Sequence, residues 1–270
     1  MAMVTVQFAG SVPEIHDAQM VPMIFAPYAA EVAARVVAGP CHDVLETAAG
    51  TGVLTRALAP HLAKDARYVV TDLSPPMLER AQSRQPPDDR ISWQVADAMA
   101  LPFPDASFDV VCCQFGAMFF PDRVAGFAES RRLLRPGGRF FVAVWDALEA
   151  NVLTDCVNDV LSAWFDGSSS NFFRRLPHGY HDLARIEADF RAAGFADVSL
   201  EQVDKISTAP SALSVAQALC MGTPMRNEIV GRDPTALEAV TALAAKAVAA
   251  RFGTGAIAAP MRAIVVTAVV

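Results

Sequence analysis

A carboxylate and a turn of small residues stand next to each other early in the chain. The stretch from Val44 to Gly52 reads V-L-E-T-A-A-G-T-G, in which an apolar strand ends at Glu46 and a helix follows from about Val53. Glycine lets the backbone adopt a positive φ and approach a ligand closely. The first amides of a helix have no partner within it and point into such a turn. The pattern therefore predicts a site for a nucleotide-like ligand at the carboxyl edge of a parallel sheet.

The acidic residue helps to separate two cofactor classes that use such a turn. A dinucleotide fingerprint is G-x-G-x-x-G, with helix-start amides facing a pyrophosphate. Here Thr55 stands at the third glycine position, and Ala48 or Gly50 stands at the first, depending on register. Glu46 would repel a pyrophosphate, whereas it suits a cationic ligand such as S-adenosylmethionine, which carries a sulfonium and an ammonium. A nicotinamide cofactor is the alternative.

A second carboxylate, Asp72, follows the next expected strand, Tyr68–Thr71. It lies ~20 residues after the glycine turn, the usual spacing for a residue that binds the two hydroxyl groups of a ribose. The alternative is that Asp72 caps the helix that starts near Ser74. Ribose binding is favoured because Ser74 can serve as that cap itself. Met77 on this helix is expected to lie against an adenine face or to pack in the core.

Polar residues also follow the third and fourth expected strands. Strand Ile91–Val95 leads to Asp97, whose carboxylate could accept a hydrogen bond from the exocyclic amine of an adenine. The apolar strand Phe108–Cys113 is typical of a strand covered on both faces, and it ends at Gln114. Because the carboxyl ends of parallel strands meet at one edge of a sheet, we expect all four strand ends to converge on one crevice.

The rest of the chain predicts alternating strands and helices with two helical insertions. Helices are expected over Ser11–Val37, Val53–Leu62, Arg123–Leu134, Val152–Phe165 and Leu183–Ala193, a helical insertion over Ala212–Arg251, and further strands over Arg139–Trp145, Val198–Val203 and Met261–Val270. These elements predict an α/β fold with a doubly wound, mostly parallel sheet. The expected division is an N-terminal helical cap over 1–38, a cofactor-binding core over 39–146, a lid insertion and helix over 147–194, and the last strands with a helical insertion over 195–270. All four parts are expected to form a single structural domain.

The candidates for acid–base chemistry are four side chains: His16, Tyr28, His178 and His181. Histidine changes its charge near neutral pH, but a single loop histidine is more often structural, so none of them is preferred. The insertion Ala147–Tyr180 contains a polar loop, Asp166–Asn171, which is expected to act as a lid over an acceptor. Shortening this loop is expected to change acceptor turnover more than cofactor binding.

Composition and charge disfavour several classes of function. The formal net charge of -7 disfavours binding to a phosphate backbone, which needs a basic surface. The N-terminus lacks a signal-peptide pattern, and no apolar run approaches the ~20 residues needed to span a bilayer, so a cytoplasmic protein without a membrane span is expected. The five cysteines form no C-x-x-C pair, and no Cys/His spacing suits a metal, so no metal site is expected.

Four blocks of sequence carry a resemblance to a known family. They read V-L-E-T-A-A-G-T-G, V-V-T-D-L-S-P-P-M-L, A-D-A-M-A-L-P-F-P-D-A-S-F-D-V-V and L-R-P-G-G-R-F, and they span Asp43 to about Trp145. In this order they resemble class I S-adenosylmethionine-dependent methyltransferases, of the small-molecule branch that includes ubiquinone and menaquinone biosynthesis enzymes. The resemblance implies a seven-stranded Rossmann-like sheet with the last strand antiparallel. Ala48 stands where a glycine is frequent, so altered turn detail rather than lost binding is expected.

The resemblance also implies roles for individual residues. Glu46, Gly50 and Gly52 are expected to line the methionine moiety. Two further residues of the same turn, Thr47 and Ala48, are expected to bind the cofactor. Asp72 is expected to hold the ribose. Four residues are expected to surround the adenine: Leu73, Met77, Asp97 and Ala98. Gln114 is expected to lie beside the methionine end.

The expected reaction is an in-line transfer of a methyl group to an oxygen, nitrogen or carbon nucleophile of a small organic acceptor, driven mainly by positioning. The alternatives are a NAD-dependent oxidoreductase and a non-catalytic module that binds S-adenosylmethionine. Methylation of nucleic acid is disfavoured because Gln114 begins Q-F-G-A, in place of an N-P-P-Y-type loop, and because the charge is acidic. The acceptor, the methylated atom and the oligomeric state are left open.

Overall fold

The computed structural model describes residues 12–166 and 172–270. Its strands are β1 (Asp43–Glu46), β2 (Arg67–Asp72), β3 (Ile91–Val95), β4 (Phe108–Gln114), β5 (Leu134–Trp145), β6 (Asp197–Ala209) and β7 (Ile257–Val269). Its helices are α1 (Val12–Ile15), a π-helical segment (His16–Phe25), α2 (Ala26–Val37), α3 (Val53–Leu58), α4 (Pro75–Arg84), α5 (Arg123–Leu133), α6 (Val152–Trp164), α7 (Phe172–Arg175), α8 (Leu183–Ala192), α9 (Ala212–Met221), α10 (Met225–Arg232) and α11 (Leu237–Phe252). Short 3-10 turns span Ala59–His61, Ala117–Phe119 and Leu148–Ala150.

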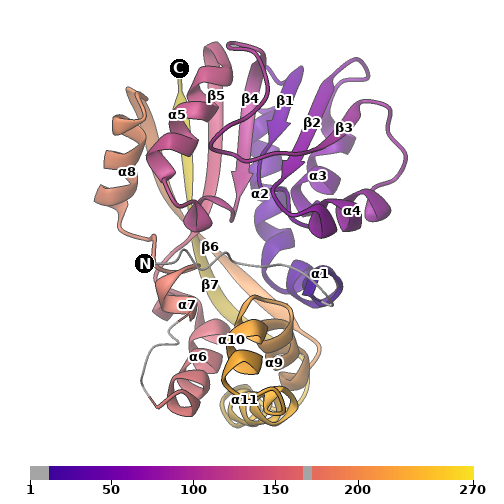
Figure 1. Cartoon of the computed structure of the whole chain (residues 1–270), viewed down its shortest axis with the longest axis vertical. Helices are drawn as coiled ribbons and strands as arrows, with labels where there is room; N and C mark the ends of the chain where they lie inside the picture. Colours follow the sequence, from indigo (N-terminus) through magenta and orange to yellow (C-terminus); the bar gives the residue numbers. More distant parts are fainter. Residues whose placement is uncertain (1–11, 167–171) are drawn as a thin grey trace.

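The seven strands form one sheet in the order β3-β2-β1-β4-β5-β7-β6. Neighbours from β3 to β5 are parallel, whereas β7 runs antiparallel to both β5 and β6. This arrangement confirms the predicted α/β fold with seven strands and an antiparallel last strand. Because β3, β2, β1 and β4 are consecutive parallel neighbours, their carboxyl ends meet at one edge of the sheet (Figure 1).

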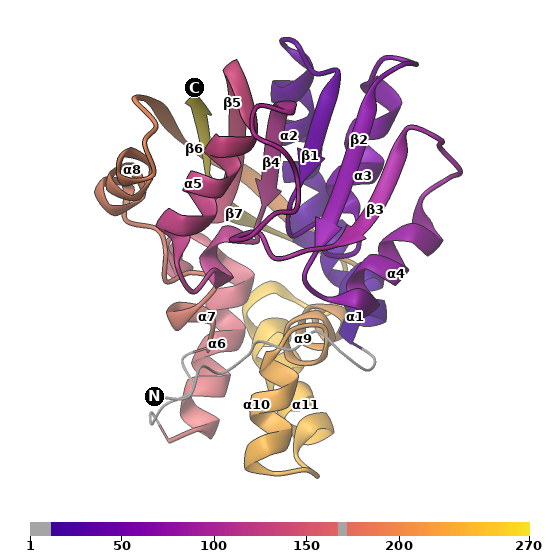
Figure 2. The ribbon, with the colours of Figure 1, turned by 45° about the horizontal axis from the view of Figure 1, so that its top comes forward.

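Helices cover both faces of this sheet. Figures 1 and 2 place α5 and α8 in front of it and α2 and α3 behind it. Central strands carry β-branched residues, such as Val110 and Val111, which are fully buried because both faces are covered. On the front face, Phe127 of α5 stacks on Phe190 of α8 at 4.3 Å between ring centroids and meets Phe140 of β5 edge-on at 5.8 Å. Aromatic packing therefore joins the helices to the sheet.

A group of helices, which we call the helical lid (α6, α7, α9, α10 and α11), lies beyond the carboxyl edge. Strands β6 and β7 are 13 residues long, pair along their whole length, and reach past the other strands to these helices (Figure 1). Helix α11 packs on both α6 and α9, so the two insertions of the sequence come together in space. The division of the chain at residues 38, 146 and 194 stays a prediction.

Three strands extend well beyond their predicted bounds, among them β7, which begins at Ile257 instead of Met261. Strand β5 begins at Leu134 instead of Arg139, because Leu134 already pairs with Phe108 before a shift in register. Strand β6 continues past Val203 to Ala209, where it still pairs with β7.

The predicted polar loop Asp166–Asn171 lies outside the described residues except for Asp166, whose carboxylate pairs with Arg232 of α10 at 2.6 Å.

One stretch of the described chain, Val12–Val37, could cross a membrane by its length and composition alone. Half of its most apolar window is buried inside the structure. A core helix of a globular domain meets the same criteria, so a single such stretch is weak support for a span. The expectation that no segment spans a membrane stays a prediction.

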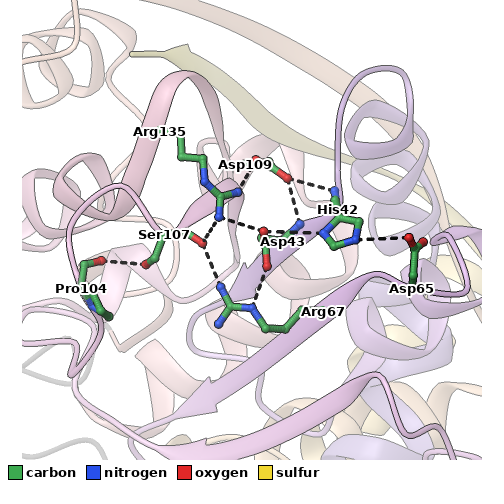
Figure 3. A network of polar contacts seen from close by, with 8 residues as sticks. All are labelled: His42, Asp43, Asp65, Arg67, Pro104, Ser107, Asp109 and Arg135. Carbon is green, nitrogen blue, oxygen red and sulfur yellow. Dashed lines mark hydrogen bonds and ion pairs between the residues drawn. The ribbon is translucent and has the colours of Figure 1, made fainter.

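The opposite, amino edge of the sheet is held by a network of charges (Figure 3). Asp43 at the start of β1 accepts from Arg67 of β2 at 2.7 Å and from Arg135 of β5 at 2.9 Å. Arg135 also pairs with Asp109 of β4 at 2.5 Å. Burial alone would raise the pKa of Asp43, but the hydrogen bonds from the two arginines outweigh it and hold the pKa below its ordinary value. The network ties four strands together at the edge away from the lid.

Candidate functional site

A cavity of about 760 Å³ lies between the carboxyl edge of the sheet and the helical lid. Its walls come from the turns after β1 to β4, the π-helical segment, and the lid. The volume lies within the range of about 300–1,000 Å³ that is usual for small-molecule sites. One cavity thus touches both the predicted cofactor turns and the predicted insertions.

The turn after β1 needs small residues for geometric reasons. Ala48, Gly50 and Gly52 all have positive φ, of 53°, 57° and 77°. Ala48 and Gly50 line the cavity. A Cβ on Gly116, in the connection after β4, would stand only 2.3 Å from the Cβ of Ala48. The two turns therefore approach so closely that side chains larger than a methyl group do not fit between them.

Asp72 joins the first two turns and faces the cavity. Its Oδ2 accepts a hydrogen bond from the Gly50 amide and its Oδ1 from the Ser74 amide, both at 2.7 Å. Ser74 stands at the N-cap of α4, but its side chain makes no cap hydrogen bond, so the prediction that Ser74 itself serves as the cap is wrong. Burial raises the pKa of Asp72, although backbone amides oppose the shift. Asp72 therefore has a local structural role as well as a place on the cavity wall.

Glu46 does not line the cavity, although its strand end was expected to converge on the same crevice as those that carry Asp72 and Asp97. It is 1% exposed, and its Oε2 accepts hydrogen bonds from Thr55 at 2.7 Å and from the hydroxyl of Tyr68. Burial raises the pKa of Glu46 to about 7, although the hydrogen bonds from Tyr68 and Thr55 oppose the rise. Thr47 and Gly52 are also absent from the wall. Glu46 thus joins β1, β2 and α3 beneath the turn.

The four predicted adenine contacts lie together on one side of the cavity: Leu73, Met77, Asp97 and Ala98. Met77 and Ala98 are buried, whereas Leu73 is 65% exposed. The Asp97 Oδ1 atom accepts from the Met99 amide at 2.9 Å. Asp72 and Asp97 give this side of the cavity two carboxylates. The roles of these residues toward a cofactor stay predictions.

Gln114 at the end of β4 carries an unsatisfied acceptor. Its Nε2 donates to the backbone oxygen of Phe25 at 3.2 Å, which fixes the amide plane. Its Oε1 is buried without a hydrogen-bond partner among the described residues, and Gln114 lines the cavity. A buried acceptor without a partner is unfavourable, so a ligand that brings a donor group to this place would be stabilised.

Two of the four acid–base candidates, His16 and His178, line the cavity. The Nδ1 atom of His178 lies 2.8 Å from the backbone oxygen of Asp146, so Nδ1 carries the hydrogen and Nε2 offers a lone pair. Burial lowers the pKa of His178 to about 4, and it lowers that of His16 to about 4 as well. The ring of His16 stacks on Phe25 at 4.9 Å between centroids. Both histidines are therefore neutral at pH 7.

The other two candidates do not reach the cavity. Tyr28 is fully buried and donates its hydroxyl hydrogen to the backbone oxygen of Val203 at 3.0 Å. Burial raises the pKa of Tyr28 far above neutrality. His181 is exposed, and its Nδ1 contacts the backbone oxygen of His178 at 2.7 Å. The structure therefore brings His16 and His178 to the cavity and leaves Tyr28 and His181 outside it.

Among the lining residues that the sequence analysis did not predict are Phe115, Trp145 and Arg123. Phe115 and Trp145 stack with 3.9 Å between ring centroids and form a flat apolar surface. Phe115 has a positive φ of 56°, which no sequence pattern indicates. Arg123 is the one Arg or Lys side chain among the described lining residues. Its signal in the sequence is weak: a cation at the first position of a helix, where the helix dipole disfavours it.

Comparisons with known proteins agree with this architecture. A methyltransferase domain family matches residues 45–142. A demethylmenaquinone methyltransferase of Mycolicibacterium vanbaalenii is 34% identical over 168 residues, which are 59% of this chain and 70% of that protein. An uncharacterized protein of Mycobacterium tuberculosis strain H37Rv is 37% identical over 129 residues, which are 47% of this chain and 46% of that protein. The chain thus spans about half the length of this last relative.

Among solved structures, the YcgJ protein of Bacillus subtilis superposes with a TM-score of 0.58 at 20% sequence identity. The superposition covers 90% of this chain and 98% of that one. At this identity the likeness concerns the fold. The family match and the relatives with higher identity concern the part of the chain that carries the cofactor turns, whereas most of the lid lies outside residues 45–142.

Proposed function

Because this chain belongs to the class I S-adenosylmethionine-dependent methyltransferase family, we propose that it transfers a methyl group from S-adenosylmethionine to a small organic acceptor. One observation carries the proposal: a single cavity extends from the turns after β1 to β4, where the family binds its cofactor, to the apolar wall of the helical lid. Cofactor and acceptor would then meet within one enclosed space, which is what transfer between them requires.

The residues at the sheet edge fit the cofactor. Asp72 and Asp97 offer carboxylate oxygens that suit hydroxyl and amine donors, and each oxygen of Asp72 has a second lone pair besides the one used by a backbone amide. The unpartnered Oε1 of Gln114 suits a cationic or N–H donor. When bound, S-adenosylmethionine supplies a methyl group already activated by its sulfonium charge. The described wall on this side carries no Arg or Lys side chain that would oppose that charge.

The lid side of the cavity would hold the acceptor. Phe115 and Trp145 provide a flat wall, and Phe172 and Phe173 of α7 add apolar surface opposite the turns. Such a wall excludes water and favours a ligand with a flat, apolar body. The relative from Mycolicibacterium vanbaalenii is named a demethylmenaquinone methyltransferase, and we expect an acceptor with a flat, aromatic ring system here.

His178 is the candidate that the geometry favours as a positioning residue. Its Nε2 lone pair has no hydrogen-bond partner among the described residues, and the contact of Nδ1 with the backbone oxygen of Asp146 fixes its tautomer. Since a pKa of about 4 makes His178 a weak base, its expected role is to accept a hydrogen bond from the nucleophile and orient it. The variant His178→Asn keeps a donor near Asp146 but places no acceptor at the position of Nε2. It should reduce methyl transfer with cofactor affinity unchanged, and unchanged transfer would rule the role out.

We also expect a cytoplasmic protein that acts on a small molecule and neither binds nucleic acid nor spans a membrane. The acidic net charge of -7 disfavours binding to nucleic acid. Half of the most apolar window of Val12–Val37 is buried inside the structure, which disfavours a membrane span. Separation of cell extract into soluble and membrane fractions tests this. Recovery of the protein only with membranes would contradict it.

Calorimetric titration tests the cofactor. S-adenosylhomocysteine should bind the purified full chain, and NAD should not; binding of NAD alone would overturn the proposal in favour of an oxidoreductase. Transfer is tested with S-adenosylmethionine labelled in its methyl group and a small-molecule extract of cells. Label should appear in an extracted compound. Cofactor binding without any transferred label would favour a module that only binds S-adenosylmethionine.

A further inference from the structure

The described wall of the cavity carries one arginine, Arg123, and no lysine. Arg123 begins α5, with Asp122 as the N-cap, and its side chain lines the cavity. A positive charge at a helix N-terminus opposes the helix dipole, so this placement is unfavourable unless a negative partner compensates it. No carboxylate lies within 4.0 Å of the guanidinium in the parts of the chain that the structure describes.

The guanidinium is held in place but not satisfied. One terminal nitrogen donates to the backbone oxygen of Met118 at 3.1 Å. The central carbon lies 4.3 Å from the ring centroid of Tyr180, a distance typical of a cation–π contact. The hydroxyl of Tyr180 donates to Asp189 of α8 at 2.9 Å, which fixes the ring. The Nε atom of Arg123 is buried without a hydrogen-bond partner among the described residues.

The charged groups of the cavity wall come from different elements: Asp72 and Asp97 follow β2 and β3, whereas Arg123 begins α5. The carboxylates of Asp72 and Asp97 lie on the side of the predicted adenosine contacts, and Arg123 is the one Arg or Lys on the whole described wall. The sulfonium and ammonium of S-adenosylmethionine suit the carboxylates, and its one anionic group, the methionine carboxylate, is expected at the turn after β1 rather than at α5. The guanidinium of Arg123 is therefore available to the methyl acceptor. A planar guanidinium recognises a carboxylate with two parallel hydrogen bonds, and such pairs are strong when water is excluded.

From this arrangement, and resting on the proposed methyl transfer, we propose that the acceptor carries an anionic group, a carboxylate on a flat aromatic body, that pairs with Arg123. The aromatic body would lie against an apolar surface formed by Phe119 and Phe120, in the connection after β4, and by Phe172 of α7. The carboxylate would supply the missing partner of the Nε hydrogen and compensate the charge at the start of α5. Arg123 would thus select among acceptors by charge.

The experiment uses matched pairs of probes that differ only in charge: 4-hydroxybenzoate with 4-hydroxybenzamide, and 2-naphthoate with 2-naphthamide. Binding to the full chain is measured by calorimetry with S-adenosylhomocysteine present. In the wild type, each carboxylate should bind at least 10-fold more tightly than its amide. Equal binding within both pairs, or no binding of either carboxylate at millimolar concentration, would overturn the proposal.

Variants assign the preference to one side chain. Arg123→Met should abolish the difference between carboxylate and amide, and Arg123→Lys should keep part of it, because lysine keeps the charge but lacks the planar fork. Arg131→Met is the matched control: Arg131 lies on the same helix, is absent from the cavity wall, and donates to the backbone oxygen of Gly194 at 2.9 Å. The control should keep the wild-type preference. A preference that persists in Arg123→Met would contradict the assignment.

The two proposals fail in different ways. If S-adenosylhomocysteine does not bind the wild type, the proposed function fails, whatever the probes do. If S-adenosylhomocysteine binds the wild type and Arg123→Met equally but the carboxylates show no preference, only the acceptor proposal fails. Should Arg123→Met unfold, Arg123→Gln provides the same test with a polar side chain of similar length, and its unchanged affinity for S-adenosylhomocysteine shows that it is folded.

Discussion

The Oδ2 atom of Asp72 accepts a hydrogen bond from the backbone amide of Gly50 at 2.7 Å, so the end of β2 holds the turn that follows β1. The other carboxylate oxygen holds the amide of Ser74 at the start of α4. One side chain therefore fixes two turns that line the cavity. A ribose bound here would meet a carboxylate that is already oriented, which reduces the entropy lost on binding.

Asp72→Ala should weaken the binding of S-adenosylhomocysteine by about 1–3 kcal/mol, because hydrogen bonds to a buried carboxylate are lost. Asp72→Asn keeps one acceptor oxygen and should show a smaller loss. Calorimetric titration measures both affinities, and circular dichroism shows whether each variant is folded. A folded Asp72→Ala variant that binds with wild-type affinity would refute the assignment of the ribose to Asp72.

A second prediction concerns the contact between Ala48 and Gly116. Gly116→Ala would place a Cβ 2.3 Å from that of Ala48, so it should destabilise the fold by about 1–3 kcal/mol through overpacking. Ala48→Gly removes the opposing methyl group and relieves a positive φ, so alone it should be close to neutral. The double variant should regain much of the stability lost in Gly116→Ala. Chemical denaturation of all four proteins measures the coupling, and strictly additive effects would show that the two turns do not touch.

The strand ends show what the sequence could and could not predict. Strand composition and order predict the edge at which Asp72, Asp97 and Gln114 meet, because parallel strands end on one side of a sheet. The direction in which Glu46 points could not be predicted, since it depends on Thr55 and Tyr68, which donate to its carboxylate from two other elements. A residue at the end of a strand faces the cavity or the core according to such partners.

The residues and helices around the lid were also hard to predict, because their roles depend on contacts between distant parts of the chain. The importance of Arg123 depends on Tyr180, which lies far along the chain and reaches α5 only in the folded structure. The segment 147–194 contributes helices to the lid and also α8, which packs on α5 at the sheet. Helical periodicity predicts that such helices exist, but not which face of the sheet receives them.

Glu46→Gln should change the pH dependence of stability. The pKa of Glu46 in the folded chain, about 7, lies above the ordinary value of 4.5, so its contribution is favourable below pH 4.5 and is lost as the pH rises toward 7. The variant has no such group. It should therefore gain stability relative to the wild type between pH 5 and pH 8, on the order of 2–3 kcal/mol at most. Thermal unfolding at several pH values measures the difference.

His16 and His178 titrate in the opposite sense. Their pKa values of about 4 lie below the ordinary 6.5, so their contribution is lost as the pH falls from 6.5 toward 4. The wild type and the Glu46→Gln variant both contain these histidines, so their contribution cancels in the difference in stability between the two proteins. That difference reports the Glu46 carboxyl group alone. A difference that stays constant from pH 5 to pH 8 would show that Glu46 has an ordinary pKa.

The charge network at the amino edge should affect stability without affecting binding. Asp109 accepts from the backbone amide of Asp43 at 2.9 Å and pairs with Arg135 at 2.5 Å, at the edge of the sheet opposite the cavity (Figure 3). Asp109→Ala should lower the free energy of unfolding by about 1–3 kcal/mol, because a partly buried amide and a guanidinium lose their partner. The affinity for S-adenosylhomocysteine should stay at the wild-type value. Denaturant unfolding and calorimetry measure the two quantities separately.

The same variant has a pH signature and a matched control. Burial would raise the pKa of Asp109, but the amide of Asp43 and the side chain of Arg135 hold it below its ordinary value of 3.8. The stabilisation is therefore complete above pH 3.8 and is lost as the pH falls through the lowered pKa, so the deficit of Asp109→Ala should shrink in acid. Asp105→Ala removes an exposed carboxylate that pairs with Arg132 and should cost less than about 1 kcal/mol. If Asp109→Ala and Asp105→Ala lower the free energy of unfolding equally, the partial burial of the network around Asp109 contributes nothing to stability.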